Sequence, residues 1–331
     1  MSKRKQDSLI IGIPSKGRLQ ENANAFFANA GLKVKQAPGG REYVGRLSGI
    51  ENVAVAFLSA SEIVARLEDG SIHFGVTGED LIRENLEDAD KVVELVLPLG
   101  FGYADVIVAV PQSWIDVETM ADLDDVALAF HRRHGRRLRI ATKYINTTRR
   151  FFADHGIADY RIVESAGATE GAPAAGTAEA IVDITTTGST LAANNLKILD
   201  DGVMLKSQAN LVASLTANWT PAALAAAATM LDRIDAKLSA ETHVVVSARG
   251  KLNRAKLVKE VTAEFNCTAQ PDEGALSFLC PRGVLQAVAT RLREAGADVV
   301  TVTSAEYIFH AKNALMDRLR KRLKKSVPHS P

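Results

Sequence analysis

Residues 164–196 contain the pattern that most restricts the fold of this chain, because a strand, a polar loop and a helix start follow one another directly. The run Ala180–Ile184 is apolar except for Asp183, which predicts a buried strand. Hydroxyl side chains and one glycine fill residues 185–190, and the run 191–193 favours a helix. A strand that leads into a helix is the repeating unit of α/β proteins.

The loop at residues 185–190 has the chemistry of an anion-binding site. The N–H groups of a first helical turn have no internal partner and lie at the positive end of the helix dipole, so amides and hydroxyls hold a phosphate there together. Gly188 lets the backbone approach closely. Asp183 can accept hydrogen bonds from sugar hydroxyls or from metal-bound water. A phosphorylated sugar satisfies both features, and an ordinary strand-to-helix turn with Ser/Thr caps is the alternative.

Three other polar loops follow predicted strands. Lys16 and Arg18 surround Gly17 after the apolar run 9–14, which suits a polyphosphate, although a solvated basic turn is the alternative. A glycine turn at 75–80 repeats the scheme, and residues 131–150 carry eight Lys or Arg and no acid, with several of them beside a helix start. Because α/β folds bind ligands at the carboxyl ends of strands, we expect the loops near 15, 75, 143 and 185 to converge on one cleft.

The segments E-G-A-P (170–173), A-E-A-I-V-D-I (178–184) and T-T-G-S-T-L (186–191) resemble the signature of the ATP phosphoribosyltransferases, which open histidine biosynthesis. K-G-R-L (16–19), G-V-T-G-E-D (75–80) and A-T-K-Y-I-N-T-T-R (141–149) are similar to further motifs of that family. The resemblance spans about residues 9–310. It implies transfer of the phosphoribosyl group of phosphoribosyl pyrophosphate (PRPP) to N1 of ATP, with release of pyrophosphate and with Mg²⁺ bound through the substrate phosphates.

The resemblance also implies roles for individual residues. The residues expected to contact PRPP are Glu170, Glu179, Asp183, Thr186, Thr187, Gly188, Ser189 and Thr190. Those expected to contact ATP are Lys16, Gly17, Arg18, Gly75, Thr77, Gly78, Asp80 and Arg149, and the expected catalytic residues are Asp183, Lys16, Arg18 and Lys143. Glu179 stands where the family usually has Asp, and Leu58 where it often has Arg, for which Arg41 or Arg46 is the candidate replacement.

Strands and helices alternate through residue 238, which predicts an α/β fold with mostly parallel sheets. By resemblance this part is a two-lobed, periplasmic-binding-protein-like core, with residues 1–104 plus 205–238 as lobe I and 105–204 as lobe II carrying the PRPP loop. The order β-α-β-β-α-β over 243–303 predicts a ferredoxin-like unit. The resemblance makes 239–331 an ACT-like regulatory domain in which histidine inhibits the enzyme.

The C-terminal stretch 312–325 carries seven basic residues and one acid at helical spacing. We expect a solvated helix end there, and contact with an anionic surface or within an oligomer is the alternative.

Length and charge narrow the class of protein further. A chain of 331 residues usually forms two or three domains, and a net charge of +1 gives no argument for nucleic-acid binding. Residues 1–7 lack the apolar core of a signal peptide, and no stretch reaches the roughly 18 apolar residues of a membrane span, so a cytoplasmic protein is expected. Cys267 and Cys280 are expected to be free core thiols without zinc. A homo-oligomer, dimer or hexamer, is also expected.

Two other functions remain open from the sequence. A cytoplasmic protein that binds a small molecule or phosphosugar for regulation can have the same two-lobed fold, since fold does not fix function. An orotate-type phosphoribosyltransferase is disfavoured, because that family usually shows two adjacent acids in its phosphate motif, and no predicted strand here has such a pair before the T-G-x-T pattern.

Overall fold

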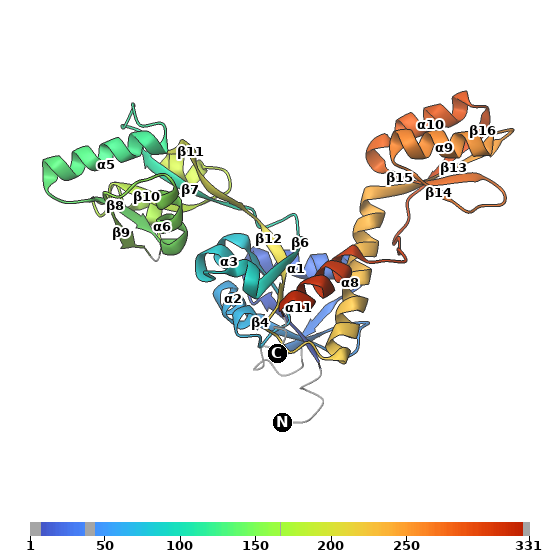
Figure 1. Cartoon of the computed structure of the whole chain (residues 1–331), viewed down its shortest axis with the longest axis horizontal. Coiled ribbons are helices and arrows are strands. Elements are labelled where there is room, and N and C mark those ends of the chain that lie inside the picture. The colour runs from blue at the N-terminus through green and yellow to red at the C-terminus, as the bar shows by residue number, and fades with distance from the viewer. Residues whose placement is uncertain (1–7, 37–43, 166, 327–331) are drawn as a thin grey trace.

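The computed structural model describes residues 8–36, 44–165 and 167–326. Figure 1 shows three units in a row, with the N-terminal unit in the centre. Each unit is built on its own sheet, of seven, five and four strands. Two lobes of mixed α/β structure followed by a small C-terminal unit agree with the predicted fold class.

The central unit, lobe I, has the strand order β2-β3-β4-β1-β5-β12-β6. Its strands are β1 (Leu9–Pro14), β2 (Val34–Gln36), β3 (Val44–Leu47), β4 (Val53–Leu58), β5 (Phe74–Gly78), β6 (Val93–Pro98) and β12 (Ala209–Ser214). One sheet face packs on α1 (Gly17–Asn29) and α8 (Pro221–Thr242), and the other packs on α2 (Ala60–Glu68), α3 (Glu79–Asn85) and α4 (Ala89–Val92).

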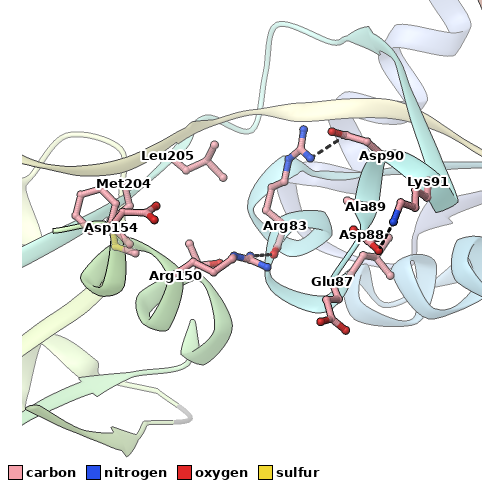
Figure 2. A pocket seen from close by; sticks show the side chains of 13 residues that line it. Arg83, Glu87, Asp88, Ala89, Asp90, Lys91, Arg150, Asp154, Met204 and Leu205 are labelled. Atoms are coloured by element: carbon pink, nitrogen blue, oxygen red, sulfur yellow. Dashed lines mark hydrogen bonds and ion pairs between the residues drawn. The ribbon is translucent and has the colours of Figure 1, made fainter. Parts of the chain in front are cut away.

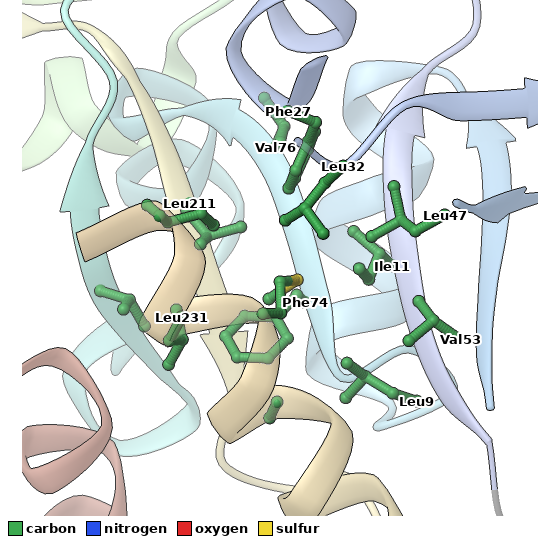
Figure 3. Close-up of a cluster of buried hydrophobic side chains, with 14 of the residues drawn as sticks. Leu9, Ile11, Phe27, Leu32, Leu47, Val53, Phe74, Val76, Leu211 and Leu231 are labelled. Carbon is green, nitrogen blue, oxygen red and sulfur yellow. The ribbon is translucent and has the colours of Figure 1, made fainter. Parts of the chain in front are cut away.

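The core of lobe I follows from strand alternation. Leu9 and Ile11 are fully buried on the face that meets α1 and α8, where Phe27 and Leu231 pack against them (Figure 3). Burying each such side chain stabilises the fold by about 1.5–3 kcal/mol. The predicted capping box at the start of α2 is confirmed, since Ser59 and Glu62 bond each other's backbone N–H groups.

Lobe II has the strand order β11-β7-β10-β8-β9. Its strands are β7 (Ala104–Pro111), β8 (Leu138–Thr142), β9 (Tyr160–Glu164), β10 (Ala180–Thr185) and β11 (Leu196–Ser207). Its helices are α5 (Met120–His134), α6 (Ile145–Asp154), α7 (Ser189–Ala193) and the 3₁₀ turn η2 (Thr169–Gly171). The chain crosses between the lobes twice, from β6 to β7 and from β11 to β12 (Figure 1).

The prediction of mostly parallel sheets is wrong for both lobes. Within the described residues, the parallel pairs are β1–β4, β1–β5, β10–β8 and β8–β9, and every other pairing in these two sheets is antiparallel. Parallel neighbours need a crossover helix between them. The strands β7, β11 and β12 pair antiparallel with their neighbours, and they border the two crossings of the chain between the lobes.

The C-terminal unit follows α8 without a loop. It consists of β13 (His243–Gly250), α9 (Arg254–Phe265), β14 (Thr268–Gln270), β15 (Leu276–Pro281), the turn η3 (Arg282–Val284), α10 (Leu285–Glu294) and β16 (Ala297–Thr303). The strands run antiparallel in the order β14-β15-β13-β16, which confirms the predicted ferredoxin-like arrangement. Cys267 and Cys280 are free and lie in its core, as predicted, and burial raises the pKa of both thiols.

The last helix, α11 (Ala314–Ser326), returns to lobe I and packs against β6 and α8 (Figure 1). Met316 and Leu319 are buried in the core cluster of lobe I. Arg318 and Arg322 lie 2.9 and 2.8 Å from the Glu94 carboxylate. The prediction of a solvated helix end is therefore wrong, because apolar residues recur at helical spacing between the basic ones.

Candidate active site

A cavity of about 480 Å³ opens in lobe II where β8 and β10 end, and we call it the lobe II pocket. It is lined by Lys143, Gly167, Ala168, Thr169, Glu170, Asp183, Ile184, Thr185, Thr186, Thr187, Thr190 and Leu191. The structure thus brings together most of the residues predicted to contact PRPP. Lys143 comes from a different loop than the others. Of the four polar loops expected to converge on one cleft, those near 143 and 185 line this pocket, and those near 15 and 75 do not.

The hydroxyl-rich loop, residues 185–190, is shaped by Gly188, which has φ +73° and is the N-cap residue of α7. This left-handed conformation strains any residue with a Cβ. The N–H of Gly188 donates to Oγ1 of Thr185 over 2.8 Å, and the hydroxyls of Thr187 and Ser189 lie 2.9 Å apart. The loop therefore presents a compact set of hydroxyl groups beside the pocket.

Asp183 and Lys143 supply opposite charges to the pocket. Burial raises the pKa of the Asp183 carboxyl, the N–H of Ile184 and the Lys143 ammonium lower it in part, and the neighbouring Glu170 raises it again. The N–H of Ile184 donates to Asp183 over 2.8 Å. Two carboxylates and one ammonium close enough to influence each other can hold sugar hydroxyls and a phosphate in one site.

Glu179, one of the residues expected to contact PRPP, does not line this pocket. It precedes β10, whereas Asp183 and the hydroxyl-rich loop lie toward the other end of that strand. Its carboxylate accepts hydrogen bonds from the guanidinium and the backbone N–H of Arg139 and from Arg136. Burial raises its pKa, but these hydrogen bonds outweigh burial and bring the pKa to about 2. In this structure the partners of Glu179 are therefore basic residues beside the sheet.

The predicted basic loop of lobe I follows β1, as expected. Lys16 is the residue before α1, Gly17 has φ +75°, and the side chains of Lys16 and Arg18 are exposed. Of the candidates to replace the family Arg at Leu58, Arg46 lies on β3, and Arg41 lies outside the described residues.

The second predicted ATP segment is packed inside lobe I. Thr77 is fully buried, and a Cβ at Gly75 would lie 2.4 Å from the Ile63 side chain, so Gly75 is required by packing. A Cβ at Gly78 would lie 2.2 Å from the Asp80 carboxylate. The structure therefore gives these glycines and Thr77 a role in packing. Arg149 is exposed on α6, outside the lining of the lobe II pocket.

The two lobes meet through α3 and α6, which begin after β5 and β8 respectively. The Tyr144 hydroxyl of lobe II donates to the Asp80 carboxylate of lobe I over 2.8 Å, and both residues are buried. Burial and the Asp80 charge raise the pKa of Tyr144 strongly, so the phenol stays protonated. A cavity of about 470 Å³ lies at this junction, where Arg150 reaches the backbone carbonyl of Arg83 and the Arg83 side chain points toward Asp90 (Figure 2).

The α6 start, which the basic pattern predicts as a favourable place for phosphate, is already occupied. The N–H groups of Asn146 and Thr147 donate to the carboxylate of Glu84. Sequence reasoning missed Glu84, which belongs to no recognised motif. The expected PRPP contacts also left out Thr185, although the anion-binding loop predicted at residues 185–190 includes it.

No group of three or more His, Cys, Asp or Glu suited to a metal ion occurs in the described parts of the chain. Among the same residues, no helix combines the length and the apolar character needed to cross a bilayer.

The two-lobed α/β core, and a pocket that combines an acid-bearing strand with a hydroxyl-rich loop, fit the class of enzymes that transfer a phosphoribosyl group. Residues 59–236 match the family model described as HisG, ATP phosphoribosyltransferase. The ATP phosphoribosyltransferase of Bradyrhizobium diazoefficiens is 57% identical over 94% of this chain and 97% of its own length, and that of Afipia carboxidovorans is 55% identical over the same shares. The chain belongs to the ATP phosphoribosyltransferase family, and it is a phosphoribosyltransferase of the first step of histidine biosynthesis.

A solved structure agrees with the fold. A chain of the ATP phosphoribosyl transferase (HisG:HisZ) complex from Thermotoga maritima aligns with a TM-score of 0.52 and 24% identity, over 68% of this chain and 95% of that chain. At this identity the likeness supports the fold alone.

Proposed function

We propose that the lobe II pocket binds PRPP and that N1 of ATP attacks C1 of its ribose there, releasing pyrophosphate. The observation that carries this proposal is the convergence of Asp183, Glu170, Lys143 and the hydroxyl-rich loop on one cavity. In this assignment Thr186, Thr187, Gly188, Ser189 and Thr190 hold the 5-phosphate. The two carboxylates accept hydrogen bonds from the ribose hydroxyls.

The reaction needs charge stabilisation more than covalent chemistry. At an anomeric carbon, bond breaking runs ahead of bond making, so positive charge develops on the ribose and negative charge on the leaving pyrophosphate. Asp183, Glu170 and Lys143 line one cavity, and in this assignment the two carboxylates stabilise the ribose and Lys143 provides a cation for the leaving group. Partial burial of Asp183 strengthens its interaction with the developing cation. Adenine N1 is already a nucleophile, so no side chain has to act as a base.

ATP is proposed to approach from lobe I. Lys16, Gly17 and Arg18 follow β1, which is parallel to β5, and β5 leads into the helix that contacts lobe II. The basic loop therefore lies at the edge of lobe I from which the lobe contact is made. Lys16 and Arg18 are exposed and suited to a triphosphate. Closure of this edge onto the lobe II pocket would align the two substrates.

Mg²⁺ fits this site as an ion carried by the substrate phosphates. The pocket offers two carboxylates, Asp183 and Glu170, which is fewer protein ligands than a dedicated cage needs and suits an ion that keeps water and phosphate oxygens. When bound, Mg²⁺ supplies charge neutralisation to the pyrophosphate.

Three further expectations stay proposals. Histidine is proposed to bind the C-terminal unit and inhibit the enzyme, and the chain joins this unit to lobe I at both ends, through α8 and α11, which supports such coupling. A homo-oligomer, dimer or hexamer, is supported by the sheet edge β16, where Val299 is 56% exposed. A cytoplasmic location suits a biosynthetic enzyme.

The decisive test is ultraviolet absorbance of the purified full chain with ATP, PRPP and Mg²⁺ while pyrophosphate is removed. A rise that needs all three reagents is expected, because substitution at N1 changes the adenine chromophore. Addition of histidine should suppress the rise if the C-terminal unit is its sensor. Binding of PRPP without any rise would indicate a phosphosugar-binding protein and would overturn the catalytic assignment.

A further inference from the structure

Helix α6 begins without a capping side chain of its own lobe. Its N-cap residue, Tyr144, makes no side-chain bond to the first turn. Instead, the two carboxylate oxygens of Glu84 in α3 accept hydrogen bonds from the N–H groups of Asn146 and Thr147, each over 2.9 Å. First-turn N–H groups otherwise lack partners, and a carboxylate is favoured at the positive end of a helix. Lobe I thus caps a helix of lobe II.

The capping is reciprocal. The side-chain amide of Asn146 donates to the carbonyl of Glu84 over 3.0 Å, and the Arg150 guanidinium donates to the carbonyl of Arg83. Figure 2 shows Arg150 of α6 reaching across the junction toward Arg83. Carbonyl groups in the last turn of a helix need donors as much as first-turn N–H groups need acceptors, and a cation is favoured at that end. Each helix end therefore satisfies free backbone groups of the other.

The backbone at residues 143 and 144 connects this junction to the lobe II pocket. Tyr144 is 1% exposed and is held to lobe I by Asp80, whose other carboxylate oxygen accepts a hydrogen bond from Ser207 over 2.9 Å. Ser207 ends β11, one of the two crossings between the lobes. The residue before Tyr144 is Lys143, whose ammonium lies 5.2 Å from the centre of the Tyr144 ring and which lines the pocket. The first turn of α6 therefore fixes the backbone that carries Lys143.

We propose that Glu84 is a positioning residue for the transferase reaction: it caps α6 from lobe I and so holds Lys143 in the lobe II pocket. The proposal rests on the assignment of PRPP to that pocket. Removal of the carboxylate leaves the N–H groups of Asn146 and Thr147 unpaired and loosens the turn next to Lys143. PRPP binding in lobe II then depends on a residue of lobe I that does not touch the substrate.

The test measures PRPP binding by calorimetry on the full chain for wild type, Glu84→Ala, Lys143→Ala and the double variant. We expect Glu84→Ala and Lys143→Ala each to weaken PRPP binding about tenfold. If Glu84 acts through Lys143, the double variant binds no more weakly than Lys143→Ala alone, since residues that work together are not additive. Glu87→Ala is the matched control, because Glu87 lies just past the same helix and is exposed.

The possible outcomes distinguish failure of the PRPP assignment from failure of the positioning role of Glu84. Unchanged PRPP binding in Lys143→Ala would overturn the assignment of PRPP to this pocket, and the inference with it. Weakened binding in Lys143→Ala but not in Glu84→Ala, or additive losses in the double variant, would overturn the positioning role alone. Glu84→Gln repeats the comparison if Glu84→Ala does not fold, since Gln keeps the shape and removes the charge. A purely structural Glu84 would lower the melting temperature without the dependence on Lys143.

Discussion

The guanidinium of Arg139 lies 2.6 Å from the carboxylate of Glu179, before the first residue of β10. Asp183 stands four residues further along, which at the rise of a β-strand is about 13 Å away. Two acids of one short motif are therefore separated by the length of the strand. Glu179 neutralises the basic residues beside the sheet, whereas Asp183 reaches the lobe II pocket.

Glu179→Gln is expected to destabilise the protein without changing its chemistry. The carboxylate is only 14% exposed and loses its charge-assisted hydrogen bonds, so the free energy of unfolding should fall by about 1–3 kcal/mol near neutral pH. The pKa of Glu179 is about 2 in the folded protein, against an ordinary value of 4.5. The stabilisation is thus present above pH 4.5 and is lost as the pH falls toward 2, so the two melting temperatures should converge there. Asp125→Asn, an exposed change on α5, is the control.

Asp183→Asn is expected to lower turnover strongly while keeping the fold. Removal of this charge beside the developing cation should lower turnover about 100- to 1,000-fold. Because burial raises the pKa of Asp183 above its ordinary value of 3.8, the charged form costs stability once the pH rises past that range. The variant should melt at the same temperature as wild type or higher at neutral pH, and this gain should vanish below pH 3.8. Wild-type turnover would remove Asp183 from the mechanism.

Gly188→Ala should weaken PRPP binding selectively. The residue has φ +73° and open space around an added Cβ, so the change costs about 1–2 kcal/mol through backbone strain rather than through a clash. We expect the KM for PRPP to rise and the KM for ATP to stay constant. Gly135→Ala has the same kind of strain and open space at the end of α5, and an equal KM change there would contradict the loop assignment.

Leu319→Ala tests the docking of α11. The side chain is fully buried against lobe I, and its truncation should lower the free energy of unfolding by about 2–5 kcal/mol. Lys321→Ala on the exposed side of the same helix should have little effect. Thermal melting followed by circular dichroism compares the two, and equal melting temperatures would show that α11 is not part of the lobe I core in solution.

Local patterns predicted much of this structure correctly. The strand at 180–184, the loop after it and the capping box at Ser59 and Glu62 each depend on residues that are near one another in sequence. Their geometry follows from strand alternation and from the bonding needs of a helix start. The place of Asp183 and of the hydroxyl-rich loop in one pocket could be expected for the same reason.

Features that depend on distant contacts could not be predicted. The bond from Tyr144 to Asp80 and the cap from Glu84 join residues more than sixty positions apart, and no local pattern indicates them. The distance of Glu179 from the pocket was not visible in the sequence either, because the length of β10 separates Glu179 from Asp183 although both belong to one motif. For α11, the run of basic residues hid the apolar stripe that Leu315, Met316, Leu319 and Leu323 form.

Because α11 returns to lobe I, the ferredoxin-like unit is inserted between two helices that pack in lobe I, α8 and α11. A chain that stops at Thr242 would expose the part of the lobe I core that Leu319 covers. It would also remove Arg318 and Arg322, the ion-pair partners of Glu94. Loss of activity in such a shortened chain would report damage to lobe I and not the absence of a histidine sensor. Separating catalysis from regulation requires removal of residues 243–313 alone, with a linker that joins α8 to α11.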